Sequence, residues 1–186
     1  MGKLIYLMNV SLDGFVARPD GSVDWTMVDD ELHSWFNEHH RSLSASLYGR
    51  RLYELMAAYW PTGDRDPNAT EVMREYARIW QATPRIVFSS TLDSVDHNSR
   101  LARGDIEEEL AGARQESDGD IEVGGPTLAA SFIRRGLVDV FGLMIHPVVL
   151  GAGKPFFPEL ESPIQLRQTA TKQFASGVVY MGYERA

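Results

Sequence analysis

Residues 121–128 read Ile-Glu-Val-Gly-Gly-Pro-Thr-Leu, a short apolar strand that runs into a glycine turn and then into a helix with proline in its first turn. Proline is favourable there because the N–H that it lacks is one that a helix start leaves unpaired. Arg134, Arg135 and Gly136 mark the end of this helix, since basic residues and glycine are typical of helix C-termini. The order of strand, glycine turn and helix predicts one unit of a parallel α/β sheet.

The same alternation continues on both sides of this unit. Apolar runs bounded by turn residues predict strands at 3–10, 45–48, 86–88, 99–101, 121–123 and 138–149. Helical spacing and capping residues predict helices around 29–43, 50–59, 69–81, 105–115 and 126–135, with a loop at 60–68. Two alternating stretches, 165–174 and 178–185, predict a terminal hairpin. We therefore expect an α/β fold of three layers, α/β/α, with a mostly parallel mixed central sheet and a C-terminal antiparallel hairpin.

The composition is that of an ordinary globular chain, which we expect to form a single domain over residues 1–186. Of its 186 residues, 44% are hydrophobic and 24% are charged, unlike a disordered chain. The net charge of −8 offers no basic face to a nucleic acid. The lack of cysteine excludes disulfides, thiolate metal sites and a cysteine nucleophile. Asn9 and Asp13 interrupt the apolar N-terminal run, and no run reaches membrane-spanning length, so we expect a cytoplasmic protein without a membrane partner.

Glycine turns after predicted strands are candidates for binding a diphosphate. Gly124 and Gly125 lie between a strand and a helix, where a backbone without side chains can approach phosphate oxygens and the helix dipole favours negative charge. The alternative is a tight turn that needs glycine for its geometry only. The sequence of this turn by itself favours neither interpretation.

Arginines and hydroxyls follow two other predicted strands. Gly49-Arg50-Arg51 repeats the strand-to-helix junction with two guanidinium groups, which suit the additional phosphate that distinguishes NADPH from NADH. Ser89-Ser90-Thr91 supplies hydroxyls at a third strand end. Surface charge and turn capping are the ordinary roles of such residues, and the functional interpretation depends on all three segments meeting at one edge of the sheet.

Asp30 is the candidate for proton donation to a substrate, through water, in a site partly enclosed by Trp25. The competing interpretation is that Asp29 or Asp30 is the N-terminal cap of the following helix. His146 ends a predicted strand at the ligand edge, where its ring would touch substrate, although a buried structural histidine is the more common role. His39 and His40 are helix neighbours that point to different faces, so we expect no metal site.

In this order and spacing the motifs resemble the dihydrofolate-reductase-like superfamily, and most closely its branch related to the C-terminal reductase domain of bacterial riboflavin biosynthesis protein. The resemblance spans nearly the whole chain. Its most specific part is Gly136-Leu137-Val138-Asp139 followed by residues 146–153, His-Pro-Val-Val-Leu-Gly-Ala-Gly. Trp25 and Asp30 have the separation of the tryptophan and acidic residue that bind pterin in classical dihydrofolate reductases. Two positions depart from the family pattern, Leu52 for a threonine and Ala129 for a tyrosine near the nicotinamide.

The resemblance implies an NADPH-dependent oxidoreductase that forms a homodimer. It would pass a hydride to a small heterocyclic or carbonyl substrate, pterin-like or pyrimidine-like. In this it would resemble 5-amino-6-(5-phosphoribosylamino)uracil reductase and dihydrofolate reductase. Asp30 would be catalytic, and Trp25, Asp30 and His146 would contact substrate. The cofactor contacts would be Gly49, Arg50, Arg51, Ser89, Ser90, Thr91, Gly124, Gly125, Pro126, Thr127, Leu128, Leu150, Gly151, Ala152 and Gly153. The departures at Leu52 and Ala129 keep open a non-catalytic nucleotide- or small-ligand-binding protein on the same fold.

Overall fold

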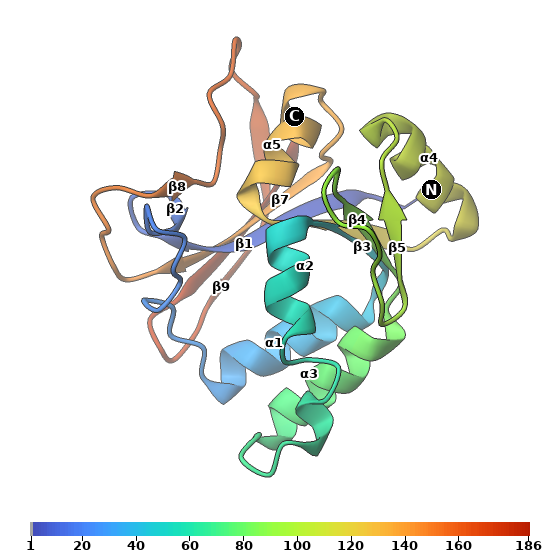
Figure 1. Ribbon diagram of the computed structural model, residues 1–186. Coiled ribbons are helices and arrows are strands. Elements are labelled where there is room, and N and C mark those ends of the chain that lie inside the picture. The colour runs from blue at the N-terminus through green and yellow to red at the C-terminus, as the bar shows by residue number, and fades with distance from the viewer. Residues whose placement is uncertain (1) are drawn as a thin grey trace.

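The computed structural model describes residues 2–186, which build a central sheet with helices on two sides (Figure 1). The eight strands of this sheet lie in the order β5-β4-β3-β6-β1-β7-β10-β9. They are β1 (Leu4–Ser11), β3 (Leu43–Gly49), β4 (Arg85–Phe88), β5 (Ser99–Ala102), β6 (Asp120–Gly124), β7 (Val140–His146), β9 (Leu166–Gln173) and β10 (Val179–Arg185). A second sheet pairs β2 (Phe15–Ala17) with β8 (Lys154–Pro155).

The pairing of the strands is mostly parallel. β1 runs parallel to β6 and β7, β3 runs parallel to β4 and β6, and β4 runs parallel to β5. β10 is antiparallel to both β7 and β9, so the chain ends in a hairpin at one side of the sheet. The predicted mixed sheet with a C-terminal antiparallel hairpin is confirmed.

Helices cover both faces of the sheet, which confirms the three layers. They are α1 (Asp30–Arg41), α2 (Arg50–Ala57), α3 (Glu71–Ala82), α4 (Ile106–Glu116) and α5 (Pro126–Arg134), with a short 3₁₀ helix at Gly63–Arg65. Successive side chains of a strand point to opposite faces. In β6, Ile121 and Val123 join the core that includes Leu110 of α4 and Phe132 of α5, while Glu122 faces α1. Figure 1 shows α4 and α5 on one side and α1 and α3 on the other.

Three of the helices begin at a side-chain cap, in which a side-chain oxygen accepts a hydrogen bond from a first-turn N–H. Asp29 caps α1 at Leu32 N, Thr70 caps α3 at Met73 N, and Asp105 caps α4 at Glu107 N. These three helices begin within two residues of the starts that we predicted from helical spacing and capping residues. No helix among the described residues is long and apolar enough to cross a membrane.

The structure differs from the sequence prediction in two connections. The strand predicted at 138–149 ends at His146, because Pro147 has no N–H to donate to the sheet. The small β2–β8 sheet was not predicted, since strands of three and two residues carry too little pattern to be read from sequence. This sheet brings the loop after β1 against the loop after β7. A Cβ atom on Gly153 would lie only 2.2 Å from the carbonyl oxygen of Ala17, so the approach depends on glycine.

Candidate functional site

The carboxyl ends of the parallel strands bring together the glycine turns found in the sequence. β3 and β6 are neighbours, and Tyr48 pairs with Gly124 where these strands end. A Cβ atom on Gly49 would lie 3.7 Å from the Cβ atom of Leu128, so the turn after β3 touches the start of α5. Ligands of open α/β sheets collect at this edge. The two predicted phosphate-binding turns thus form one surface.

The helices that begin at these two turns, α2 and α5, lack the side-chain caps of the other three. Gly49 and Gly125 occupy their N-cap positions, and no side chain of residues 2–186 bonds to their first-turn amides. A helix start carries unpaired N–H groups and a partial positive charge, which together favour phosphate oxygens. Two such starts side by side fit the diphosphate of a dinucleotide.

Glycine is required in the turn after β6 for two different reasons. Gly125 has a φ of +86°, a conformation that residues with side chains rarely adopt. A Cβ atom on Gly124 would lie 2.4 Å from Cδ2 of Leu52, so this position also needs glycine for space unless Leu52 moves. Leu52, which departs from the family pattern, therefore packs directly against the predicted diphosphate turn and offers no hydroxyl there.

Replacing Gly125 by alanine is expected to lower the free energy of unfolding by about 1–3 kcal/mol, because alanine is strained at this φ. The nearest atoms to the new Cβ belong to Leu52 at 3.8 Å, so the loss comes from the backbone conformation and not from a clash. Gly112→Ala is the matched control: Gly112 lies inside α4 in open space, and this change is expected to raise stability by about 0.5–1 kcal/mol. Urea unfolding of both variants measures the difference, and equal stabilities would contradict it.

Arg50 and the hydroxyl segment after β4 meet at the same edge. The Arg50 guanidinium donates to Oγ1 of Thr91 at 3.0 Å and to Oε1 of Glu54 at 2.9 Å. Ser89 Oγ accepts hydrogen bonds from the amides of Thr91 and Leu92, so it shapes the turn. Ser90 and Arg51 are exposed, and neither side chain has a hydrogen-bond partner among the described residues. Arg50 and Arg51 therefore place positive charge beside the free hydroxyl of Ser90 and the Arg50-bonded hydroxyl of Thr91, as a ribose phosphate site would need.

The turn at Leu150–Gly153 is held by a residue that the sequence did not single out as functional. The Asp13 carboxylate accepts hydrogen bonds from the amides of Leu150 at 3.1 Å and Gly151 at 2.7 Å. A hydrogen bond from Ser11, together with these two amides, lowers the pKa of Asp13 and keeps it ionised. In the sequence Asp13 stood out only as a polar residue that interrupts the apolar N-terminal run. Its place in the turn Ser11-Leu12-Asp13-Gly14 was the available signal, but its partners lie 137 and 138 residues away.

The structure separates the roles of the two neighbouring aspartates at the start of α1. Asp29 is the cap, because its Oδ1 accepts from Leu32 N at 2.8 Å. Asp30 is the first residue of the helix and is exposed, and its carboxylate has no partner within residues 2–186. Because Asp29 caps the helix, the carboxylate of Asp30, for which the sequence predicts a chemical role, is not engaged in capping.

Trp25 and His146 lie together between the loop after β1 and the end of β7. Their rings meet edge to face, with centroids 5.4 Å apart. His146 is fully buried, its Nδ1 accepts from the Met27 amide at 3.3 Å, and its Nε2 then donates to Oδ1 of Asn9 at 2.9 Å. Burial lowers the pKa of His146, which fits a neutral ring. His146 thus supports the loop that carries Trp25. Both of its ring nitrogens already have partners, and its direct contact with substrate stays a prediction.

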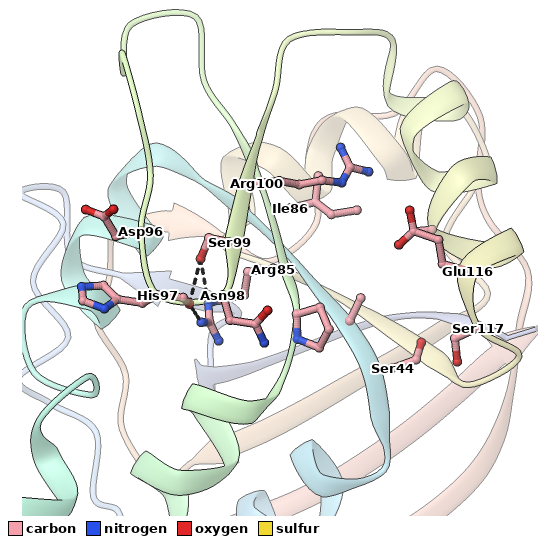
Figure 2. A pocket seen from close by; sticks show the side chains of 13 residues that line it. Ser44, Arg85, Ile86, Asp96, His97, Asn98, Ser99, Arg100, Glu116 and Ser117 are labelled. Carbon is pink, nitrogen blue, oxygen red and sulfur yellow. Dashed lines mark hydrogen bonds between the residues drawn. The ribbon is translucent and has the colours of Figure 1, made fainter.

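A cavity of about 460 Å³ lies at the opposite edge of the sheet, where the parallel strands begin. Figure 2 shows it between β5 and the end of α4, with Asp96 and His97 on one side and Glu116 and Ser117 on the other. Arg85 lines it, but this guanidinium already donates to the carbonyl groups of Trp80, Thr83 and His97. The cavity therefore lies apart from the turns described above, and its most buried cation is already occupied by the protein.

Known proteins share both the sequence pattern and the fold. The RibD C-terminal domain family matches residues 2–180. The uncharacterized protein YyaP of Bacillus subtilis is 36% identical over 182 residues, 97% of this chain and 94% of YyaP. A protein attributed to riboflavin biosynthesis from Shewanella sp. PV-4 has a TM-score of 0.79 at 19% identity, over 100% of this chain and 99% of that one. Dihydrofolate reductase from Enterococcus faecalis complexed with NADP(H) has a TM-score of 0.65 at 20% identity, over 99% and 96%.

The two solved structures show a shared fold, and they bear out the resemblance noted in the sequence. The family match covers most of the chain, and YyaP is related along nearly its whole length. The chain belongs to the RibD C-terminal domain family.

Proposed function

We propose that this protein is an NADPH-dependent reductase that passes a hydride to a small heterocyclic or carbonyl substrate, pterin-like or pyrimidine-like. The observation that carries the proposal is the pair of helix starts at Gly49 and Gly125, which no described side chain caps and which lie next to one another at the ligand edge of the sheet. The structural likeness to a dihydrofolate reductase that was complexed with NADP(H) supports it.

The residues of the site fit the parts of the cofactor. The amides at the start of α5 and the glycine turn before it would hold the diphosphate. Arg50, with Arg51 and the hydroxyls of Ser90 and Thr91, would hold the 2′-phosphate through charge-assisted hydrogen bonds. The turn at Leu150–Gly153, fixed by Asp13, would lie along the nicotinamide half.

When bound, NADPH would supply a hydride from C4 of its nicotinamide and become NADP⁺. The C=N or C=O bond of the substrate would take that hydride on carbon and a proton on nitrogen or oxygen. The protein holds the two reactants in contact, which by itself accounts for a large part of the rate. Asp30 would orient the substrate and deliver the proton through water, since its carboxylate is exposed and does not cap the helix.

Removing the Arg50 guanidinium is expected to weaken NADPH binding by about 2 kcal/mol, roughly 30-fold, because one charged contact to the 2′-phosphate is lost. NADH lacks this phosphate, so Arg50→Ala should change its affinity little. Titration calorimetry of both nucleotides with wild type, Arg50→Ala and Arg78→Ala gives the comparison. Arg78 is an exposed arginine of α3 that pairs with Glu71, and its loss should leave both affinities unchanged.

Two results would count against the proposal. If neither nucleotide binds wild type, the reductase function fails. If Arg50→Ala weakens NADPH and NADH equally, the arginine does not contact the 2′-phosphate.

A binding protein that lacks turnover is the second candidate, and Leu52 is the observation that favours it. Leu52 presents methyl groups where the family carries a hydroxyl, and Ala129 is fully buried in the core, with no polar group for the nicotinamide. Such a protein would bind NADPH but oxidise none with any acceptor. A flavin-using reductase, a third possibility, would purify yellow. We also propose a homodimer, which sedimentation analysis would test.

A further inference from the structure

The proposed site is divided by charge into two halves. On the cofactor half, Arg50, Arg51 and the amides at the starts of α2 and α5 attract anions. On the other half, the loop after β1 and the first residues of α1, residues 12–31, carry six acidic residues and one basic residue. This second half, which holds Trp25 and Asp30, is where the substrate of the proposed function would lie.

The cations near this acidic half are few, and two of them already face carboxylates. Arg18, the basic residue within it, donates to Oδ1 of Asp24 at 2.9 Å. Lys172 Nζ lies 3.9 Å from Glu31 and over the ring of Phe174. Lys154 Nζ lies at the outer turn of the loop, 3.3 Å from where a Cβ atom of Gly21 would be. None of the three forms an ion pair with Asp30, whose carboxylate has no partner among the described residues.

The same half exposes most of the large hydrophobic side chains found at the surface. Seven such residues are exposed in the described chain, and four of them lie within residues 12–31: Leu12, Val23, Met27 and Val28. A fifth, Val149, follows Val148, whose carbonyl group bonds to Leu12, so we count it with this group. Hydrogen bonds hold the group together at the ends of β1 and β7, from Leu12 N to the Val148 carbonyl at 2.8 Å and from Met27 N to His146. Leu12 and Val149 are each 66% exposed, and exposed hydrophobic residues that are grouped, unlike single ones, mark binding surfaces.

We infer that the hydride acceptor is an uncharged or cationic molecule with an apolar face, and not a phosphorylated or carboxylated one. The inference rests on the proposed function, because it concerns the substrate half of that site. A phosphate or carboxylate is normally held by several arginine or lysine side chains in a fixed geometry. Here Arg18 and Lys172 already face carboxylates, and Lys154 is a single cation at the outer turn of the loop. A phosphate or carboxylate would also stand beside the free carboxylate of Asp30, and like charges brought together in a binding site are unfavourable. An apolar face of the acceptor would cover Leu12, Met27, Val28 and Val149 without this charge repulsion.

Matched pairs of acceptors test the inference. 7,8-Dihydrobiopterin and 7,8-dihydrofolate share the reducible ring, and benzaldehyde and 4-carboxybenzaldehyde share the carbonyl group, while only the second member of each pair carries carboxylates. Titration calorimetry into protein saturated with NADP⁺ is expected to show tighter binding of the neutral member by about tenfold or more in at least one pair. Raising the salt concentration should strengthen binding of the anionic member only, because salt screens repulsion between charges.

A charge introduced at the apolar surface gives the second measurement. Val28→Lys is expected to improve the affinity for the anionic member relative to the neutral one by about threefold, the effect of one exposed ion pair. Leu160→Lys, at an exposed hydrophobic residue outside the group, should leave the ratio unchanged.

Equal or tighter binding of the anionic members would overturn the inference, and so would failure of both pairs to bind while NADP⁺ binds normally. A change from dimer to monomer in Val28→Lys would also overturn it, since the apolar group would then be covered by a second copy. Absence of NADP⁺ binding in the same samples is a separate result, and it contradicts the proposed function itself.

Discussion

Asp30→Asn is expected to lower the kcat for acceptor reduction by about 100-fold or more, which is the usual contribution of a positioned proton donor. Asparagine keeps the shape of the side chain but cannot deliver the proton. The affinity for NADPH should stay unchanged, because the proposed cofactor contacts lie at and after the ends of β3, β4, β6 and β7 and not on α1. Steady-state kinetics and nucleotide titration on the same preparation measure both quantities.

Asp29→Asn is the matched control for this variant. Asp29 is the residue that caps α1, and asparagine caps helices about as well as aspartate. The neighbouring substitution should therefore leave both the stability and the activity near those of wild type. If Asp29→Asn and Asp30→Asn lose activity equally, then the negative charge at the start of α1 matters, and the Asp30 carboxylate has no specific role. Full activity of Asp30→Asn would remove its catalytic role.

The strands and helices were predictable from sequence because their signals are local. The glycine turn and Pro126 marked the start of α5, and the apolar spacing behind Asp29 marked α1. The β2–β8 sheet was missed because it depends on contact between two loops separated by more than 130 residues. Its one sequence signal was Gly153, for which the resemblance implied a cofactor contact and which the close approach to the Ala17 carbonyl oxygen requires to be glycine.

The candidate site was predictable where strand order alone decides proximity. The segments that follow β4, β3 and β6 lie side by side because these strands are parallel and consecutive in the sheet, and Arg50 after β3 bonds to Thr91 after β4. Which aspartate caps α1 was not decidable, since either position satisfies the pattern. The role of Asp13 and the full burial of His146 also lay beyond the sequence, because both are set by partners that the folded loops bring in.

His39 and His40 show a similar limit. Their adjacent positions on a helix predicted different directions, yet both rings reach Glu122 of β6, with Nε2 distances of 2.7 Å and 3.3 Å to its two oxygens. The side chains of all three residues are at most 14% exposed. Nothing in the sequence marked Glu122, which stands in an apolar strand. This cluster joins α1, which begins at Asp30, to β6, which ends at Gly124, and so links the two halves of the proposed site.

Glu122→Gln is expected to lower the free energy of unfolding by about 3–5 kcal/mol near pH 5.5, because it breaks a buried charge pair. Burial alone would raise the pKa of Glu122, but the charge of His40 and hydrogen bonds from both histidines outweigh it and lower that pKa to about 2. Burial likewise opposes charge on His40, but Glu122 outweighs it and raises the pKa of His40 above its ordinary value.

The sign of each shift sets the pH range of this effect. The lowered pKa of Glu122 adds stability that is complete above about pH 4.5 and is lost as the pH falls toward 2. The raised pKa of His40 adds stability that is complete below about pH 6.5 and is lost as the pH rises through that raised value. The difference in free energy of unfolding between wild type and Glu122→Gln should therefore be largest between about pH 4.5 and 6.5 and decline on both sides.

Urea unfolding of the two proteins across pH 3 to 9 would measure this difference, with Glu184→Gln as control. Glu184 pairs with Lys3 at the surface, so its loss should produce only a small difference. A difference for Glu122→Gln that does not change with pH would show that the cluster acts by packing and not by charge. If the cluster acts by charge, the stability difference between wild type and Glu122→Gln has its maximum between about pH 4.5 and 6.5. If Glu122→Gln also binds NADPH more weakly and reduces the acceptor more slowly in that pH range, the buried pair holds Asp30 in position relative to the glycine turn.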